Sequence, residues 1–355
     1  MNAHNQSLAN QGIDRASTVR ILMAPLQQLL DLPGVNELAV NVPGEVWVKR
    51  GAEWEFKRVP ELTYQTLDRL SRALCVFNHV DYGSINSIVL PTGERVQITT
   101  PPVTLDGCIA INIRTSNSTV KTLPELNADG SFSEAVDTSF NRPDEEEIAR
   151  LTRVSDFTRL DADEAELLLL KAQGRWFEFL QLAVLSHKNI VIAGRTGSGK
   201  TTLARSLIEV VPHSERILTF EDTHELRLPN HPNKVHMLYG EGPGRVTPAD
   251  CLKAAMRMTP DRIIPAELRG EEAWEYLSSC NTGHPGSITT LHGNSAVEAY
   301  GRIHALVMGS RTGSTLTPEF VRAQIYRTVH VTLFLQDRKL KEVFYDPIFA
   351  KAQTL

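Results

Sequence analysis

The sequence lacks most features that mark secreted or membrane-embedded chains. Its 355 residues include only four cysteines, and these lie far apart, so no C-x-x-C pair suggests zinc binding or redox chemistry. No apolar run approaches 18 residues, and residues 1–17 are polar, without the apolar core of a signal peptide. These absences predict a cytosolic protein in which each cysteine is a small core residue.

An excess of basic charge is also missing. The formal net charge is −5, so the sequence has no overall electrostatic footprint for nucleic acid or an anionic membrane. We therefore expect no direct sequence-specific binding to nucleic acid. Hydrophobic residues make up 41% and charged residues 22%, which is typical of globular proteins, and the length suffices for two domains.

One stretch carries the strongest motif, a glycine-rich turn between an apolar strand (189–193) and a helical pattern (202–208). Glycines let backbone N–H groups surround an anion, and the following helix adds its positive N-terminal end. Lys200 is expected to bridge the outer phosphates of ATP, and the Thr201 hydroxyl to ligate Mg²⁺. A chance glycine-rich turn is the alternative, which the flanking strand and helix disfavour. The candidate nucleotide-binding residues are Gly194, Arg195, Thr196, Gly197, Ser198, Gly199, Lys200, Thr201 and Thr202.

The remaining pattern predicts an α/β fold with two domains. Residues 18–116 alternate short strands and helices, typical of a small N-terminal α+β domain, with Thr63 as the N-cap of a helix. Residues 1–17 are expected to be a flexible N-terminus and residues 117–160 a linker with one helix. From residue 161 to 355, helices and strands alternate, which predicts a parallel sheet covered by helices, with ligands at the carboxyl ends of the strands.

Acidic residues follow two of the predicted strands in this second domain. Glu221, Asp222 and Glu225 come after strand 217–220, and Glu267 ends the apolar strand 263–266. A nucleotide hydrolase needs a carboxylate to polarise the attacking water and another to hold Mg²⁺, which fits a Walker B role for Glu267. The alternatives are solvated carboxylates at strand ends, or helix capping by Asp222.

Histidines occur in two groups. His284 and His292 flank the strand 287–291, and either could contact a γ-phosphate. Their spacing disfavours a zinc pair. His224, His231 and His236 are expected to be ordinary surface or loop residues.

Two arginines of the first domain, Arg95 and Arg114, are either rim residues or arginine fingers. Hydrolysis needs positive charge on the transferred phosphoryl group, and another domain or subunit often supplies it.

Four ordered blocks together resemble the secretion traffic ATPases. They look like that family's Walker A (194–201), Asp box (218–226), Walker B (260–270) and His box (282–292). The segments 90–98 and 111–114, with Pro101-Pro102 between them, resemble the N-terminal domain of the type IV secretion branch. One departure is Pro265, where relatives usually have an aliphatic or small residue; because proline cannot donate a ladder hydrogen bond, the strand is expected to end early.

This resemblance implies a RecA-like P-loop NTPase core, a Mg²⁺-dependent ATPase activity and a homohexameric ring with nucleotide held between the two domains. It also implies peripheral attachment to the cytoplasmic face of the bacterial inner membrane, through other inner-membrane and cytoplasmic ATPase components of the secretion system. The activity would power pilus biogenesis and transfer of DNA or protein. The motif match assigns catalytic roles to Glu267, Glu221, Lys200, Arg95, Arg114 and His292, nucleotide contacts to Asp222, Glu225 and His284, and Mg²⁺ to Thr201 and Glu267.

Three other functions remain open at this point. One is a motor of type IV pili or type II secretion, which shares the same core. Another is a nucleotide-gated scaffold with little turnover. A nucleic-acid motor is the third, and the negative net charge argues against it.

Overall fold

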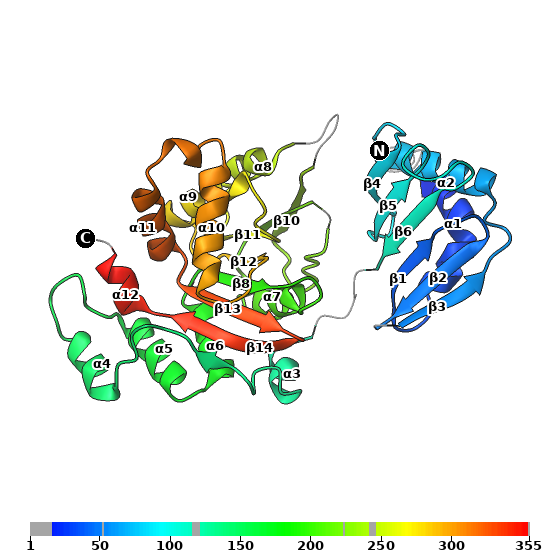
Figure 1. The fold of residues 1–355 in the computed structure, drawn as a ribbon. Helices are drawn as coiled ribbons and strands as arrows, with labels where there is room; N and C mark the ends of the chain where they lie inside the picture. Colours follow the sequence, from blue (N-terminus) through cyan, green and yellow to red (C-terminus); the bar gives the residue numbers. More distant parts are fainter. Residues whose placement is uncertain (1–15, 52, 116–120, 223, 241–245, 354–355) are drawn as a thin grey trace, which may run out of the picture. The chain divides into compact units, whose positions relative to one another are not determined.

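The computed structural model describes residues 16–51, 53–115, 121–222, 224–240 and 246–353, which divide into two compact units (Figure 1). The described part of the first unit ends at residue 115. The second begins at residue 121. Each unit has its own hydrophobic core.

The first unit is an antiparallel sheet covered on one face by two helices (Figure 1). The strand order is β3-β2-β1-β6-β5-β4, and every pairing is antiparallel. Alternate apolar residues such as Val46 and Val48 are fully buried toward the helices, which is the pattern of a sheet with one covered face. The elements are α1 (Ala16–Leu30), β1 (Val35–Val40), β2 (Glu45–Arg50), β3 (Glu53–Arg58), α2 (Tyr64–Phe77), β4 (Ile85–Val89), β5 (Arg95–Thr99) and β6 (Ala110–Arg114).

The N-cap predicted for α2 is confirmed, because the Thr63 side chain accepts a hydrogen bond from the backbone N–H of Thr66 at 3.2 Å. Helix α1 begins at Ala16. Val19, Met23 and Leu26 are buried at helical spacing, so one face of the helix packs against the core of this unit.

The second unit is an α/β core in which parallel strands carry helices on both faces (Figure 1). Hydrogen-bonded strands run in the orders β10-β9-β11 and β12-β8-β13-β14-β7. The strands are β7 (Val136–Asp137), β8 (Ile190–Gly194), β9 (Ile217–Glu221), β10 (Lys234–Leu238), β11 (Arg262–Pro265), β12 (Ile288–Leu291), β13 (Val331–Gln336) and β14 (Lys339–Tyr345). The helices are α3 (Leu123–Ala128), α4 (Glu145–Leu151), α5 (Ala162–Ala172), α6 (Trp176–Leu185), α7 (Lys200–Ile208), α8 (Pro248–Ala255), α9 (Glu272–Asn281), α10 (Glu298–Gly309), the 3₁₀ turn Gly313–Thr315, α11 (Pro318–Thr328) and α12 (Pro347–Ala352).

Strand β8 lies between two layers of helices. Ile190 and Ile192 belong to the cluster with α5, α6 and α7, whereas Val191 and Ala193 belong to the cluster with α8, α9, α10 and α11. Successive side chains of a strand point to opposite faces, so this all-apolar strand is buried on both. The α/β fold predicted from the sequence is therefore present.

Residues 121–160, expected to be a linker, instead fold into the second unit. They form α3, β7 and α4, and β7 pairs with the terminal hairpin strand β14. Leu123, Phe132 and Ile148 are buried in the same cluster as the helices α5 to α7. The burial of these apolar residues stabilises the fold of this segment. Because they are few and scattered, the mostly polar composition of the segment resembles that of a linker.

None of the helices among the described residues is both long enough and apolar enough to cross a bilayer.

Candidate nucleotide-binding site

The phosphate loop follows β8 directly and leads into α7, as the sequence predicts. Gly197 and Gly199 have φ values of 79° and 98°, in the left-handed region that favours glycine. Gly194 has no room for a side chain, because a Cβ there would lie 2.5 Å from the Leu335 carbonyl oxygen and 2.6 Å from Ser198 Oγ. The glycines thus let the loop turn tightly and lie close to β13.

Lys200 is folded back onto its own loop. Its Nζ donates hydrogen bonds to the carbonyl oxygens of Gly194 at 2.7 Å and Arg195 at 2.9 Å. Burial lowers the pKa of this ammonium, and the negative charge of Glu267 partly offsets that shift. Ser198 Oγ is buried and finds no hydrogen-bond partner among the residues described. Both groups fit a phosphate, which would give the ammonium and the hydroxyl acceptors at the mouth of the loop.

The carboxylate of Glu267 lies at the same edge of the sheet. It follows β11, and its neighbours attach to β12, since Leu268 N donates to the Thr290 carbonyl at 2.9 Å and Thr290 Oγ1 donates to the Ala266 carbonyl at 2.9 Å. Next along β12, His292 places Nε2 3.0 Å from Oε1 of Glu267. Two residues predicted from separate motifs therefore meet at the carboxyl ends of neighbouring strands.

Arg269 joins the Walker B and Asp-box acids, a role that sequence reasoning did not assign to it. Its Nε and Nη2 donate to Oε2 of Glu267 at 2.9 and 2.6 Å, and its Nη1 donates to Asp222. Burial opposes the charge on this guanidinium, but Asp222 and Glu267 outweigh it and raise its pKa. The motif block 260–270 contains Arg269 and could have indicated a role for it. The pairing of Arg269 with Asp222, however, depends on the tertiary fold.

Glu221 is fully buried at the end of β9 and organises the loop after it. Its Oε2 accepts hydrogen bonds from the backbone N–H groups of Glu225 and Leu226, both at 2.8 Å. Its Oε1 lies 3.2 Å from Nδ1 of His224. The carboxylate thus acts on its own loop, which also carries Asp222; Thr223 of this motif lies outside the described residues.

One histidine expectation differs from the structure, and another is met by an unexpectedly buried residue. His284 precedes β12 at its amino end, where Ile288 pairs with Ile190 at the start of β8, and its Nδ1 lies 3.0 Å from the Pro260 carbonyl oxygen. The phosphate loop begins at the other end of β8, roughly 13 Å along the strand, so the strand direction keeps His284 away from the loop of its own chain. His231 lies in the loop before β10, as expected, but it is fully buried, with Nε2 3.1 Å from the Val211 carbonyl oxygen.

Arg95 and Arg114 belong to the first unit. They are register partners on the neighbouring strands β5 and β6, so the fold brings the two arginines together at one end of that sheet. Glu37 of β1 is the register partner of Arg114 on its other side. Their contact with nucleotide remains a prediction.

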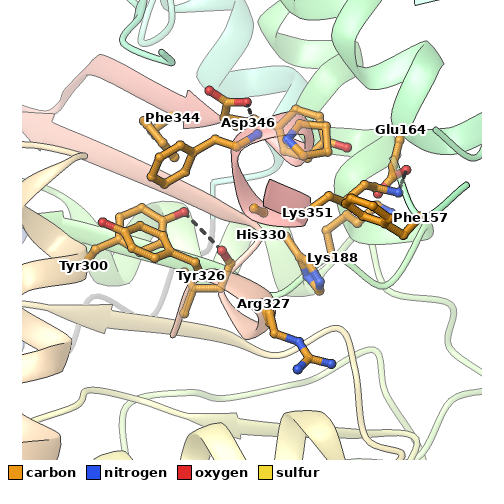
Figure 2. A pocket seen from close by; sticks show the side chains of 15 residues that line it. Phe157, Glu164, Lys188, Tyr300, Tyr326, Arg327, His330, Phe344, Asp346 and Lys351 are labelled. Atoms are coloured by element: carbon orange, nitrogen blue, oxygen red, sulfur yellow. Dashed lines mark hydrogen bonds and ion pairs between the residues drawn. The ribbon is translucent and has the colours of Figure 1, made fainter. Parts of the chain in front are cut away.

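A cavity of about 260 Å³ lies elsewhere in the second unit (Figure 2). Lys188 and His330, which precede β8 and β13, line it together with the aromatic side chains of Tyr300, Tyr326 and Phe344. It is therefore at the amino ends of these strands, opposite the phosphate loop, and it is not the nucleotide site.

The described geometry defines a class of protein. A glycine loop between β8 and α7 holds Lys200, and Glu267, Asp222 and His292 come from the ends of neighbouring strands. Together with the helices on both faces of the sheet, this is a P-loop ATPase with a RecA-like core.

Comparison with known proteins identifies the family to which the chain belongs. Residues 153–333 match the family described as "Type II/IV secretion system protein". The chain is 36% identical to the type IV secretion system protein VirB11 of Brucella suis biovar 1 (strain 1330) over 358 residues, which covers 97% of this chain and 94% of that protein. It is 34% identical to the protein VirB11 of Agrobacterium fabrum over 304 residues, covering 84% and 83%.

A solved structure agrees with this. The VirB11 ATPase from the Brucella suis type IV secretion system, in complex with sulphate, aligns with a TM-score of 0.53 and 37% identity over 96% of this chain and 98% of that one. The chain belongs to the type II/IV secretion system protein family, as an ATPase of type IV secretion. The resemblance inferred from the four motif blocks is confirmed.

Proposed function

We propose that this chain is a Mg²⁺-dependent, hexameric ATPase whose hydrolysis of ATP powers pilus biogenesis and the transfer of DNA or protein through a type IV secretion system. The observation that carries this proposal is the convergence of Lys200, Glu267 and His292 at one edge of the core sheet. Relatives at 33 and 36% identity are type IV secretion system proteins, which favours this function over a motor of type IV pili.

The candidate residues near the phosphate loop each have a role in this proposal. The loop from Gly194 to Thr202 binds the phosphates, and the ammonium of Lys200 leaves the Gly194 and Arg195 carbonyls to contact them. Glu267 is the carboxylate that orients the attacking water, and Arg269 fixes its position. His292 lies beside Glu267 and contacts the γ-phosphate. The carboxylate of Asp222 pairs with the guanidinium of Arg269. Glu221 and Glu225 shape the loop that carries Asp222.

The donor set also fits Mg²⁺. The ion prefers oxygen ligands and shares them with substrate phosphates, and the Thr201 hydroxyl and a Glu267 carboxylate oxygen are of that kind. When bound with ATP, Mg²⁺ neutralises charge on the phosphates. Glu267 Oε1 is buried beside Nε2 of His292, 3.0 Å away, and a carboxylate oxygen keeps a second lone pair that can accept from a water held by the ion.

Assembly completes the proposal. Arg95 and Arg114 supply positive charge from the first unit, of the same chain or of a neighbour in a homohexameric ring. The ring attaches peripherally to the cytoplasmic face of the bacterial inner membrane through other secretion components. These features follow from the family resemblance.

The test is the specific ATPase activity of the full chain against protein concentration, at fixed saturating ATP and Mg²⁺, with the particle size measured in the same samples. A steep rise that levels off as the ring forms is expected, because assembly completes each active site. Turnover by a species that sizing identifies as a monomer would contradict a ring requirement. No turnover at any concentration would favour a nucleotide-gated scaffold.

A further inference from the structure

Two histidines that the sequence reading left as ordinary surface or loop residues converge on Glu221. Nδ1 of His224 lies 3.2 Å from Oε1 of Glu221, and the ring centroids of His224 and His236 are 4.3 Å apart. One potential ligand atom from each of the three side chains lies within 4.8 Å of the other two. Two imidazoles and one carboxylate therefore lie close enough together for one ion to contact all three.

The core sheet positions two of these groups. Thr219 and Glu221 are alternate residues of β9, so their side chains share a face of the sheet. His236 is the register partner of Thr219 on the parallel strand β10 and lies on that same face. His224 comes from the loop after β9. Ligands fixed by strands keep their geometry better than ligands on loops alone.

Neighbouring groups already orient these ligands. Oε2 of Glu221 accepts from two backbone N–H groups, while Oε1 lies 3.2 Å from Nδ1 of His224 and accepts from the Thr219 hydroxyl at 3.4 Å. Thr219 Oγ1 lies 2.8 Å from Nδ1 of His236, where the hydroxyl can accept the ring N–H and leave the other nitrogen as a lone-pair donor. Such outer contacts are typical of histidines that bind metals.

We propose that Glu221, His224 and His236 form a binding site for a divalent cation of intermediate hardness, with Zn²⁺ as the favoured ion. Two imidazole nitrogens and one carboxylate oxygen select Zn²⁺, Co²⁺ or Ni²⁺ over Mg²⁺, which prefers oxygen ligands. Three protein ligands leave a fourth position of a tetrahedral Zn²⁺ ion for water. The partly exposed His224 gives the ion an entry path, since 33% of its side chain is exposed while that of Glu221 is fully buried.

A bound ion would link residues 224–226 to strand β10. These loop residues begin two positions after Asp222. This site is separate from the oxygen ligands proposed for Mg²⁺, and it does not depend on the proposed ATPase mechanism.

The test uses the full chain, stripped of metal with a chelator and free of nucleotide. Zn²⁺ binding is measured by titration calorimetry, and Co²⁺ is titrated with visible absorption as the readout of its coordination. One tightly bound ion per chain is expected, and a large excess of Mg²⁺ should not displace it. Thr219→Val, which keeps the side-chain volume but removes the hydroxyl, should weaken Zn²⁺ binding by roughly 10- to 100-fold.

His224→Gln and His236→Ala should each weaken it further. The matched control is His213→Ala, because His213 also lies beside another histidine, His231, with ring centroids 5.0 Å apart, but His213 belongs to no three-ligand cluster among the described residues. Lys200→Ala should bind Zn²⁺ as tightly as the unmodified chain.

Three results would overturn the site. One is the lack of one-to-one binding by the unmodified chain. Another is unchanged Zn²⁺ affinity in both His224→Gln and His236→Ala. The third is loss of binding in Lys200→Ala, which would place the ion at the phosphate loop.

Discussion

The guanidinium of Arg269 donates two hydrogen bonds to a single oxygen of Glu267, from Nε at 2.9 Å and from Nη2 at 2.6 Å. The same guanidinium also pairs with Asp222. The guanidinium of Arg269 thus links the carboxylates of Glu267 and Asp222, which belong to two different motifs, beside the phosphate loop. We regard Arg269 as a positioning residue that aims the Glu267 carboxylate.

Arg269→Lys should therefore lower kcat while leaving KM for ATP nearly unchanged. Lysine keeps the charge but cannot bridge two carboxylates with a planar fork, and a small misplacement of a reacting group can cost roughly 100-fold in rate. Steady-state kinetics would measure both parameters. The matched control is Arg175→Lys, because Arg175, the N-cap of α6, donates to one oxygen of Glu178 through the same two nitrogens. Equal kcat values for both variants would show that Arg269 has no positioning role.

Glu267→Gln should bind ATP as the unmodified chain does but lose turnover by roughly two to four orders of magnitude, the usual contribution of a positioned general base. The amide keeps the size of the side chain and removes its charge. Binding of a fluorescent ATP analogue and phosphate release would be measured on the same preparation. Full turnover in this variant would remove Glu267 from its proposed role.

Gly194→Ala should destabilise the second unit by about 1–3 kcal/mol, the typical cost of overpacking. The added Cβ would lie 2.5 Å from the Leu335 carbonyl oxygen, a backbone atom of the neighbouring strand that cannot easily move. Urea unfolding would measure the change. Gly301→Ala in α10 is the control, because nothing lies within 4 Å of a Cβ there and alanine favours a helix by about 1 kcal/mol. A Gly194→Ala protein as stable as the unmodified chain would contradict the tight approach of β8 and β13.

Acid should destabilise the fold through His330. Burial lowers the pKa of this imidazole to about 4; Lys188 acts in the same direction, and Asp161 opposes it. The unfolded chain binds the proton near pH 6.5, so between that pH and about 4 the unfolded state holds more protons. Stability is then complete above about pH 6.5 and falls as the pH drops toward 4, by at most about 1.4 kcal/mol per pH unit for this group.

Urea unfolding at several pH values would measure this slope. His330→Asn removes the titrating group, while an amide can still accept the hydrogen bond from the Asn189 N–H that His330 Nδ1 receives at 2.8 Å. Its stability should depend less on pH in this window. An unchanged slope would mean that His330 does not titrate differently in the folded state.

The sequence predicted the parts of the structure that local patterns control. Thr63 is an N-cap as expected, and the glycine loop lies between a strand and a helix. Such signals depend on neighbouring residues alone. Strand β11 ends at Pro265, in agreement with the inability of proline to continue a ladder.

Features that depend on tertiary packing were missed. Strand β3 is exposed along most of its length and shows no buried alternation, and β7 has only two residues, so neither carries a periodic signal. The pairing of Arg269 with Asp222 joins residues 47 positions apart. The cluster of Glu221, His224 and His236 depends on the parallel register of β9 and β10, which no local pattern fixes.

The most direct test of the central claim is phosphate release from ATP and Mg²⁺ by the Lys200→Ala variant. Lys253→Ala, on the exposed face of α8, serves as the control for loss of a lysine. If the loop after β8 is the nucleotide site, the Lys200 variant should lose at least roughly two to three orders of magnitude in turnover, the usual effect of removing an electrostatic contact to the reacting group. Unchanged turnover in Lys200→Ala would contradict the assignment of this loop as the active site.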